Sequence, residues 1–490
     1  MGVQKDMKKK SVGVNAVLNI IKQCCAIIFP LITFPYISRV LQVENYGKVN
    51  FSGSIIGYFY LFAALGIANY AVREGARIRN DKDKIQTFAS EVFTINFIST
   101  IISYALLFMA IIFWGKLHAY WNILLVQSIG IILTTIGADW INSIYEDYLF
   151  ITIRYIIIQF LSVCMMLLFV KKPEDYIIYA SINVIASAGA NIANFFHVRR
   201  YINLKITFHP HIKKHAKPIL LLFCNALSMQ IYVNSDMTIL GALKDDYSVG
   251  IYSAAVKIYN IIKQVLNAAI TVAIPRISAL LGQNDYKEYN KLLDRTFHAI
   301  VCLVMPAIVG IYMLSYEIIC VIGSERYAQG YWTLRILSLA LAGAVFANFF
   351  NNAILLPNKK EKFFLQATII AALINISLNF ILIPKISYLG AASTTVLAEF
   401  IVLFLGVYHA RGLYDFKISK RDIISCFFGC LIIILVCEMA KKIIAIILIR
   451  IVVSIIFSIL LYTAILVLFR NRMAQIIIVK MKKILRKGER

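Results

Sequence analysis

Long apolar runs separated by short polar segments dominate the pattern along the whole chain. About fourteen of them approach the ~20 residues that an α-helix needs to cross a bilayer. They cover approximately residues 13–37, 49–71, 87–113, 120–141, 152–170, 177–197, 218–241, 251–274, 297–321, 334–356, 364–383, 391–410, 423–440 and 443–469. The pattern therefore predicts an all-α membrane protein with about 14 transmembrane helices.

Polar side chains recur on one face of several of these helices. The clearest stripe lies on the helix expected at 251–274, where steps of three and four place its members on one helical face. Its members are Lys257, Asn260, Gln264, Asn267 and Thr271. A charge at the bilayer centre costs about 2.5 kcal/mol or more, so such residues usually face an interior cavity. We expect the helices to surround a polar lumen; the alternative for each stripe alone is hydrogen bonding between helices.

Shorter stripes occur on four other helices. They comprise Asn15, Asn19 and Lys22; Asn183, Ser187, Asn191 and Asn194; Asn225, Ser228, Tyr232 and Ser235; and Asn348 with Asn352. The first of these helices also contains Pro30 and Pro35, which remove backbone donors and predict a bend. Stripes in both halves of the chain favour a shared lumen.

Acidic residues also occur at membrane depth, where a carboxylate either pairs with a base or takes up a proton. The three candidates are Asp139, Asp236 and Glu399. Asp236 and Lys257 flank the same short loop, so an ion pair between them is one interpretation. In the alternative interpretation, Lys257 binds an anionic substrate, and Asp236 or Asp139 carries a coupling proton or cation.

The two halves of the chain correspond in sequence. Three pairs of equivalent residues are each separated by 203 positions, and they are Gly47 with Gly250, Arg73 with Arg276, and Glu91 with Asp294. Six helices lie between equivalent points, so the repeats are expected to be parallel, related by a pseudo-two-fold axis along the membrane normal. This predicts an N-terminal lobe at 1–217, a C-terminal lobe at 218–410, and an accessory region at 411–490.

Composition and charge support a membrane protein. The chain is 60% hydrophobic, and its net charge is +25. About 35 of the 50 Lys and Arg residues fall on one side when loops are assigned alternately, which places both termini in the cytoplasm. The basic residues form short blocks between apolar runs, a distribution that argues against nucleic acid. The tail Met473–Arg490 is a basic amphipathic segment expected to lie on anionic membrane lipids, and residues 276–295 predict a short helix on the same surface.

Candidate chemistry narrows the function further. The nine cysteines lie in apolar runs and are expected to be reduced thiols. A solvated loop facing lipid headgroups is favoured over a metal site for His209, His211 and His215. Nucleotide-binding and hydrolase motifs are absent from the sequence, so no cofactor and no enzymatic activity are expected. Transport would then be driven by a gradient, with H+ or Na+ as the coupling ion.

Several segments together carry a family resemblance. They are Phe34–Ala76, with Tyr46-Gly47 and Arg73-Glu74; Ala138-Asp139-Trp140; Glu146-Asp147-Tyr148; Ile151-Thr152-Ile153-Arg154; Val233–Gly241; and Val249–Ile258. In these the chain resembles the bacterial polysaccharide transporters, the Wzx-type lipid-linked oligosaccharide flippases of the MATE-related (MOP) superfamily. The resemblance weakens after about Arg411. It implies a MATE-like V-shaped cleft between two six-helix lobes, two accessory helices, and alternating access.

The resemblance also implies a cargo, an oligosaccharide on undecaprenyl pyrophosphate, moved from the inner to the outer leaflet of the cytoplasmic membrane for O-antigen, capsule or exopolysaccharide. Other polysaccharide-assembly proteins are implied as partners. The positions that fit binding of the pyrophosphate are Lys257, Lys22, Arg73 and Arg276. Asn260, Gln264 and Asn267 fit sugar hydroxyls, whereas Lys263 lies roughly 120° round the helix from Lys257 and suits a structural role.

Two alternatives to a flippase stay open. A MATE-like multidrug or cation antiporter should favour an acidic pocket, and the lysine on the stripe counts against it. A membrane-embedded polysaccharide-assembly enzyme normally needs a large catalytic loop, and no loop between the expected helices exceeds roughly twenty residues.

Overall fold

The computed structural model describes residues 12–208, 210–415, 419–476 and 478, with side chains at 17, 18 and from 21 onward. Within these ranges the regular structure is entirely helical and contains no strand. The prediction of an all-α membrane protein is therefore confirmed. His209, the basic residues before residue 12 and the predicted tail beyond residue 478 lie outside the described residues.

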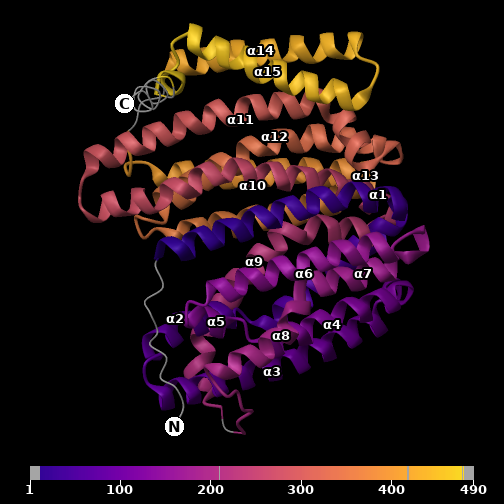
Figure 1. Cartoon of the computed structure of the whole chain (residues 1–490), viewed down its shortest axis with the longest axis vertical. Helices are drawn as coiled ribbons and strands as arrows, with labels where there is room; N and C mark the ends of the chain where they lie inside the picture. Colours follow the sequence, from indigo (N-terminus) through magenta and orange to yellow (C-terminus); the bar gives the residue numbers. More distant parts are fainter. Residues whose placement is uncertain (1–11, 209, 416–418, 477, 479–490) are drawn as a thin grey trace, which may run out of the picture. The chain divides into compact units, whose positions relative to one another are not determined.

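The helices follow one another with short connections (Figure 1). The α-helices are α1 (Val12–Ala64), α2 (Ile67–Ile78), α3 (Lys82–Phe113), α4 (Trp121–Gly137), α5 (Trp140–Ile144), α6 (Tyr148–Phe169), α7 (Tyr176–Val184), α8 (Ala190–His197), α9 (Ile212–Leu243), α10 (Asp246–Gly282), α11 (Tyr286–Gly323), α12 (Tyr331–Asn348), α13 (Glu361–Ala410), α14 (Lys420–Ile443) and α15 (Ile447–Leu468). The 3-10 segments are η1 (Gly115–Tyr120), η2 (Pro173–Asp175), η4 (Val198–Arg200) and η5 (Glu325–Gly330), and the π-helical segments are η3 (Ile185–Gly189) and η6 (Phe349–Leu355).

Twelve helical segments of the described chain are long and apolar enough to cross a membrane. Two of them contain a backbone break: α1 at Gln42 (φ 63°) and α13 at Ile386 and Ser387. Both breaks fall between apolar runs that the sequence pattern separates. Pro30 and Pro35 lie inside α1, and the residue of α1 with non-helical backbone is Gln42 instead. The count of fourteen spans stays a prediction.

The connection between α10 and α11 differs from the expectation. The two helices extend to Gly282 and from Tyr286, so no separate surface helix forms at 276–295 and that prediction is wrong. Asn284 adopts a left-handed conformation (φ 57°), which reverses the chain. Asp285 then caps α11 by accepting a hydrogen bond from the backbone N–H of Glu288 at 3.1 Å. The three-residue turn and the cap at Asp285 allow α10 and α11 to extend into the segment where a short separate helix was predicted.

Contacts divide the chain into two compact units within α9, between Thr238 and Ile239. The first unit holds α1–α8 and most of α9. The second holds α10–α15, so α14 and α15 belong to the same unit as α10–α13. The predicted lobes 1–217, 218–410 and 411–490 were drawn from the sequence repeat. These boundaries, the pseudo-two-fold axis and the V-shaped cleft stay predictions.

A buried polar chain joins three helices of the first unit. His215 of α9 is fully buried, so the expectation of a solvated loop is wrong for this residue. The hydroxyl of Tyr70 lies 2.7 Å from Nδ1 of His215, and Nε2 of His215 donates to Glu91 at 2.9 Å. His211, one turn earlier, also contacts Glu91, at 2.5 Å, but its side chain is largely exposed. The buried carboxylate on α3 needs donors, and α9 supplies them.

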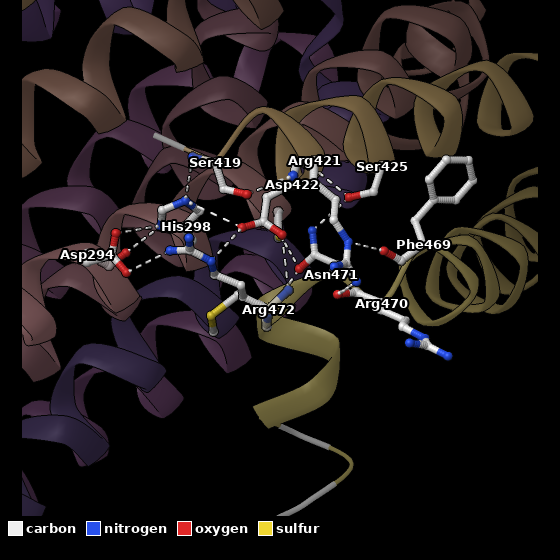
Figure 2. Close-up of polar contacts among 12 residues, drawn as sticks. Asp294, His298, Ser419, Arg421, Asp422, Ser425, Phe469, Arg470, Asn471 and Arg472 are labelled. Atoms are coloured by element: carbon white, nitrogen blue, oxygen red, sulfur yellow. Dashed lines mark hydrogen bonds and ion pairs between the residues drawn. The ribbon is translucent and has the colours of Figure 1, made fainter. Parts of the chain in front are cut away.

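A second polar cluster fastens α14 and α15 to α11 (Figure 2). Asp422, buried at the start of α14, accepts a hydrogen bond from the backbone N–H of Arg472 at 3.0 Å and lies 3.5 Å from Nε2 of His298 on α11. Arg421 donates to the carbonyl oxygens of Phe469 and Arg470, which directly follow α15. The end of α15 and the start of α14 are thus held together with α11.

All nine cysteines are free thiols. Five of them are buried, and the Sγ atoms of Cys302 and Cys426 lie 3.7 Å apart in a core formed by α11, α14 and α15. Buried thiols of this kind pack as small apolar side chains.

Candidate functional site

A cavity of about 350 Å³ lies inside the first unit. Side chains from α1, α2, α3, α4, α5, α6, η3 and α8 line it, together with the segment between α4 and α5. The polar ones are Lys22, Tyr60, Asn96, Thr134, Thr135, Asp139, Trp140, Arg154, Tyr155, Ser187 and Asn191. Two cations and one carboxylate therefore face a space surrounded by amides and hydroxyls, inside helices otherwise suited to lipid.

An ion pair between α6 and the segment before α5 dominates this cavity. Nη2 of Arg154 donates to Oδ1 of Asp139 at 2.7 Å. The side chain of Arg154 is 9% exposed, whereas that of Asp139 is 44% exposed. The guanidinium is therefore held in a dry wall, while its carboxylate partner is open to the cavity.

Two residues that line this cavity carry buried donors without acceptors. Nε and Nη1 of Arg154 are buried and have no hydrogen-bond partner in the described structure. Nε1 of Trp140, the residue after Asp139, is also buried and has no hydrogen-bond partner in the described structure. Buried donors are nearly always paired, and an unpaired one costs about 1–3 kcal/mol. These three N–H groups belong to residues that line the cavity, although the nitrogens themselves are covered, and acceptor oxygens of a ligand that reached them would satisfy them.

The turn before α5 is built to hold Asp139 at the cavity. α4 ends at Gly137 and Ala138 adopts a left-handed conformation (φ 45°), which redirects the chain. A Cβ atom on Gly137 would lie 2.5 Å from the side chain of Asn191, so only glycine allows α8 to pack here. Asn194 donates to the carbonyl oxygen of Gly137 at 2.5 Å.

The second cation of the cavity comes from α1. Nζ of Lys22 lies 5.6 Å from the centroid of the Tyr155 ring, which is on α6 next to Arg154. Cation–π contact of this kind can hold an ammonium group that has little water around it. Lys22 is one of the positions that the resemblance fits to the pyrophosphate, and it lines the same cavity as Asp139.

The stripe on α10 lies in the second unit. Lys257 and Asn260 are partly buried, and Gln264 is exposed. Asn267 accepts a hydrogen bond from Asn348 of α12 at 2.8 Å, and Asn348 in turn accepts one from Asn352. This amide chain shows that part of the stripe acts between helices. The roles of Lys257, Asn260, Gln264 and Asn267 in binding stay predictions.

The other predicted site residues have more varied surroundings. Glu399 of α13 is buried and accepts hydrogen bonds from Tyr259 at 3.0 Å and Lys263 at 3.3 Å. Lys263 therefore has the structural partner that its position on α10 led us to expect. Asp236 is buried in α9. Ion coupling by Asp139, Asp236 or Glu399 stays a prediction.

Arg73 and Arg276 lie on exposed surfaces. Arg73 of α2 pairs with the neighbouring Glu74 at 2.9 Å, with its side chain 54% exposed. Arg276, near the end of α10, is also exposed. The structure does not bring Arg73 to the cavity that Lys22 lines, and a part for either arginine in binding stays a prediction.

The second unit contains a larger cavity of opposite character. Its volume is about 740 Å³, and α10, α11, α14, α15 and the segment after α15 line it. Nearly all of the lining is apolar, with Leu303, Ile311, Ile433 and Ile455 among the contributors. A cavity of this kind suits a hydrocarbon chain and offers little to a charged group.

Comparison with known proteins identifies the family. A family model described as "Polysaccharide biosynthesis protein" matches residues 10–281, which is more than half of the chain. The chain belongs to the polysaccharide biosynthesis protein family. A second family model, MatE, matches residues 218–381 of this polysaccharide biosynthesis protein. The resemblance to MATE-related polysaccharide transporters is thereby confirmed.

Curated relatives extend over most of this polysaccharide biosynthesis protein. A putative O-antigen transporter of Escherichia coli K12 is 23% identical over 409 residues, covering 82% of this chain and 98% of the relative. The capsular polysaccharide biosynthesis protein CapF of Staphylococcus aureus is 23% identical over 412 residues, covering 81% and 98%. A probable low-salt glycan biosynthesis flippase of Haloferax volcanii is 24% identical over 239 residues, covering 48% and 50%.

Solved structures share the fold of this polysaccharide biosynthesis protein. The lipid II flippase MurJ in an inward closed conformation has a TM-score of 0.74 at 18% identity and covers 94% of this chain and 99% of its own. A MATE-family multidrug transporter in an inward-facing conformation has a TM-score of 0.56 at 13% identity, covering 81% and 94%. At these identities the likeness concerns the fold alone.

Arg154 is the charged residue of the polar cavity that the stripes and acids in the sequence did not single out. In the sequence it contributes only to the resemblance, as the last residue of Ile151-Thr152-Ile153-Arg154. One signal was available, because a lone arginine within the apolar run of α6 is an expensive residue in a bilayer and usually has a function. Its partner, fifteen positions earlier, lies across a helix end that periodicity does not reveal.

Proposed function

We propose that the protein is a flippase that moves undecaprenyl-pyrophosphate-linked oligosaccharide repeat units from the inner to the outer leaflet of the bacterial cytoplasmic membrane. It works by alternating access, with both termini in the cytoplasm and H+ or Na+ as the coupling ion. The relatives named as an O-antigen transporter, a capsular polysaccharide biosynthesis protein and a glycan flippase support this cargo class. They also support transport over enzymatic catalysis.

The observation that carries the proposal is the set of unpaired donors around the polar cavity. Arg154 contributes a guanidinium, a group that favours phosphate, and its unpaired Nε–H and Nη1–H lie on different edges of the plane, so each would donate to a separate oxygen. Trp140 adds a third N–H, and Lys22 adds a second positive charge. In this proposal they bind the pyrophosphate.

The size and the remaining lining of the cavity fit the same headgroup. Small-molecule sites commonly have volumes of roughly 300–1,000 Å³, and the cavity of about 350 Å³ lies at the lower end. It therefore suits the pyrophosphate and the sugar next to it better than a whole oligosaccharide. Asn96, Ser187 and Asn191 offer hydrogen bonds to sugar hydroxyls.

A multidrug antiporter is the second candidate, favoured by the MatE match over residues 218–381. Cationic drugs would need a cavity dominated by carboxylates. In the polar cavity the one carboxylate, Asp139, is already paired with Arg154. Drug-resistance assays on overexpressing cells separate the two functions, because a flippase for anionic lipids should confer no resistance.

Deletion of the gene tests the proposal. A flippase deletion should make one lipid-linked oligosaccharide accumulate on the inner leaflet and should remove a surface polysaccharide. Wild-type protein should restore the polysaccharide, and Arg154→Met, present at the same amount, should not. Intact surface polysaccharide after deletion, with no accumulated intermediate, would overturn the proposal.

A further inference from the structure

Two groups contact the guanidinium of Arg154, and residues of the short helix α8 hold both of them in place. On one side Asp139 accepts its hydrogen bond at 2.7 Å. Against its face, the ring of Phe150, one helical turn earlier on α6, has its centroid 5.4 Å from the guanidinium carbon. The unpaired Nε and Nη1 groups complete the guanidinium. Its direction therefore depends on what holds Phe150 and Asp139 in place.

Phe150 is held by a histidine. The ring of His197, the last residue of α8, stacks on that of Phe150 with a centroid separation of 3.6 Å and an angle of 5° between the planes. His197 has a side chain that is only 11% exposed, and its Nε2 donates to Oδ2 of Asp147 at 2.9 Å. Guanidinium, phenyl and imidazole are thus in successive contact from the cavity wall to Asp147.

Asp147 is in turn anchored from a second direction. The hydroxyl of Tyr201 donates to the same Oδ2 atom at 2.9 Å, and its ring stacks on that of Tyr145 at 4.5 Å. Burial, together with the hydrogen bond to Asp147, raises the pKa of Tyr201 to about 12. This donor therefore stays protonated at neutral pH, and the buried carboxylate keeps two donors.

The other side of the ion pair leads to the same helix. Asn142 donates to Asp139 at 3.0 Å and to Asn194 of α8 at 2.6 Å. Asn194 is fully buried and also binds the end of α4. One helix of eight residues, α8, thus supports Asp139 through Asn194 and Arg154 through His197.

We propose that His197 is the positioning residue that aims the guanidinium of Arg154 at the phosphate of the cargo, acting through the ring of Phe150. The inference rests on the proposed function for the identity of the phosphate, but its geometry belongs to the first unit alone. His197 does not line the cavity, so its effect on a ligand is indirect. The stack, rather than the charge of the imidazole, transmits that effect.

Binding of inorganic pyrophosphate to the purified full-length protein tests the inference, measured by calorimetry. His197→Ala removes the imidazole that holds Phe150 and should weaken binding roughly tenfold, which corresponds to about 1.4 kcal/mol. His197→Phe keeps a ring on Phe150 and loses only the hydrogen bond to Asp147. It should restore most of the affinity.

A matched control comes from the second unit, where His409 stacks on Phe363 with centroids 4.2 Å apart and an interplanar angle of 15°. His409→Ala removes a similar pair with no arginine of the cavity beneath it, so pyrophosphate binding should stay at the wild-type value. Phe150→Leu deletes the ring between His197 and Arg154 and should weaken pyrophosphate binding by the same factor. It provides an independent test if His197→Ala folds poorly.

The outcomes separate this inference from the proposed function. Wild-type affinity in both His197→Ala and Phe150→Leu, with Arg154→Met losing binding, would overturn the positioning role and leave the phosphate site standing. Equal weakening by His197→Ala and His197→Phe would overturn transmission through the stack. Failure of the wild-type protein to bind pyrophosphate would overturn the phosphate site itself, and the positioning role with it.

Discussion

The unequal burial of Arg154 and Asp139 predicts unequal costs for removing either partner. Asp139→Asn keeps a polar side chain but leaves the charge of a guanidinium that is 9% exposed. Arg154→Met leaves a carboxylate that is 44% exposed and can be hydrated from the cavity. Both variants lose the ion pair, and the amide oxygen in Asp139→Asn can still accept the hydrogen bond from Arg154, so a larger cost of Asp139→Asn reports the environment of the charge left behind.

The expected magnitudes follow from that environment. Stranding one charge of a buried ion pair costs about 3–5 kcal/mol, whereas an exposed pair contributes about 0–1 kcal/mol. We therefore expect Asp139→Asn to lower the free energy of unfolding by about 3 kcal/mol and Arg154→Met by about 1 kcal/mol. The double variant strands no charge and should resemble Arg154→Met alone, because the two losses are not additive.

The order of the two variants is measured by unfolding the purified protein in mixed detergent micelles and monitoring the loss of helix content. The pair between Arg450 of α15 and Glu317 of α11 is a control with the opposite asymmetry, since the acid there is 3% exposed and the arginine 17%. Arg450→Met should therefore cost more than Glu317→Gln. If Asp139→Asn is as stable as Arg154→Met, the guanidinium is not held in a dry wall and the reasoning about its unpaired donors fails.

Three further predictions concern other parts of the chain. Lys257→Ala should leave the protein inserted but abolish surface polysaccharide in cells; normal polysaccharide at normal protein levels would remove Lys257 from the site. Asp245 caps α10 by accepting from the N–H of Ser248 at 2.8 Å, so Asp245→Ala should lower stability by about 1 kcal/mol, and an unchanged thermal transition would contradict the cap. An ultraviolet titration difference between wild type and Tyr201→Phe should have its midpoint near pH 12. Because the pKa is raised above the ordinary 10.0, the hydrogen bond to Asp147 stabilises fully below pH 10 and is lost as pH rises through about 12; a midpoint near 10 would contradict it.

Periodicity and composition were sufficient to predict the helices, and the resemblance of particular segments to a known family predicted the family. Apolar runs located the spans, and the breaks at Gln42 and Ser387 fall where the pattern separates two runs. The family resemblance was visible in segments such as Phe34–Ala76, because these lie in the part of the chain that the family model matches. Exact helix ends were less predictable, since caps such as Asp285 allow helices to extend into polar loops.

The candidate site was only partly predictable, because a stripe indicates a polar face without naming its partner. Lys22 and Asp139 were both singled out in the sequence, but only the packing of α1 against α6 and α4 puts them in one cavity. His215 resembled a loop residue among lysines and proved to be a buried donor to Glu91, 124 positions away. Contacts at such separations depend on which helices pack together, and single-sequence patterns do not specify that.

The central claim is that the polar cavity of the first unit binds the phosphate of a lipid-linked sugar during its transfer across the membrane. The most direct test is the rate at which the purified protein, reconstituted in liposomes, moves an undecaprenyl-pyrophosphate-linked sugar between leaflets. Wild-type protein should accelerate transfer, and Arg154→Met at the same protein density should be at least about tenfold slower. Equal rates for the two proteins would contradict the claim.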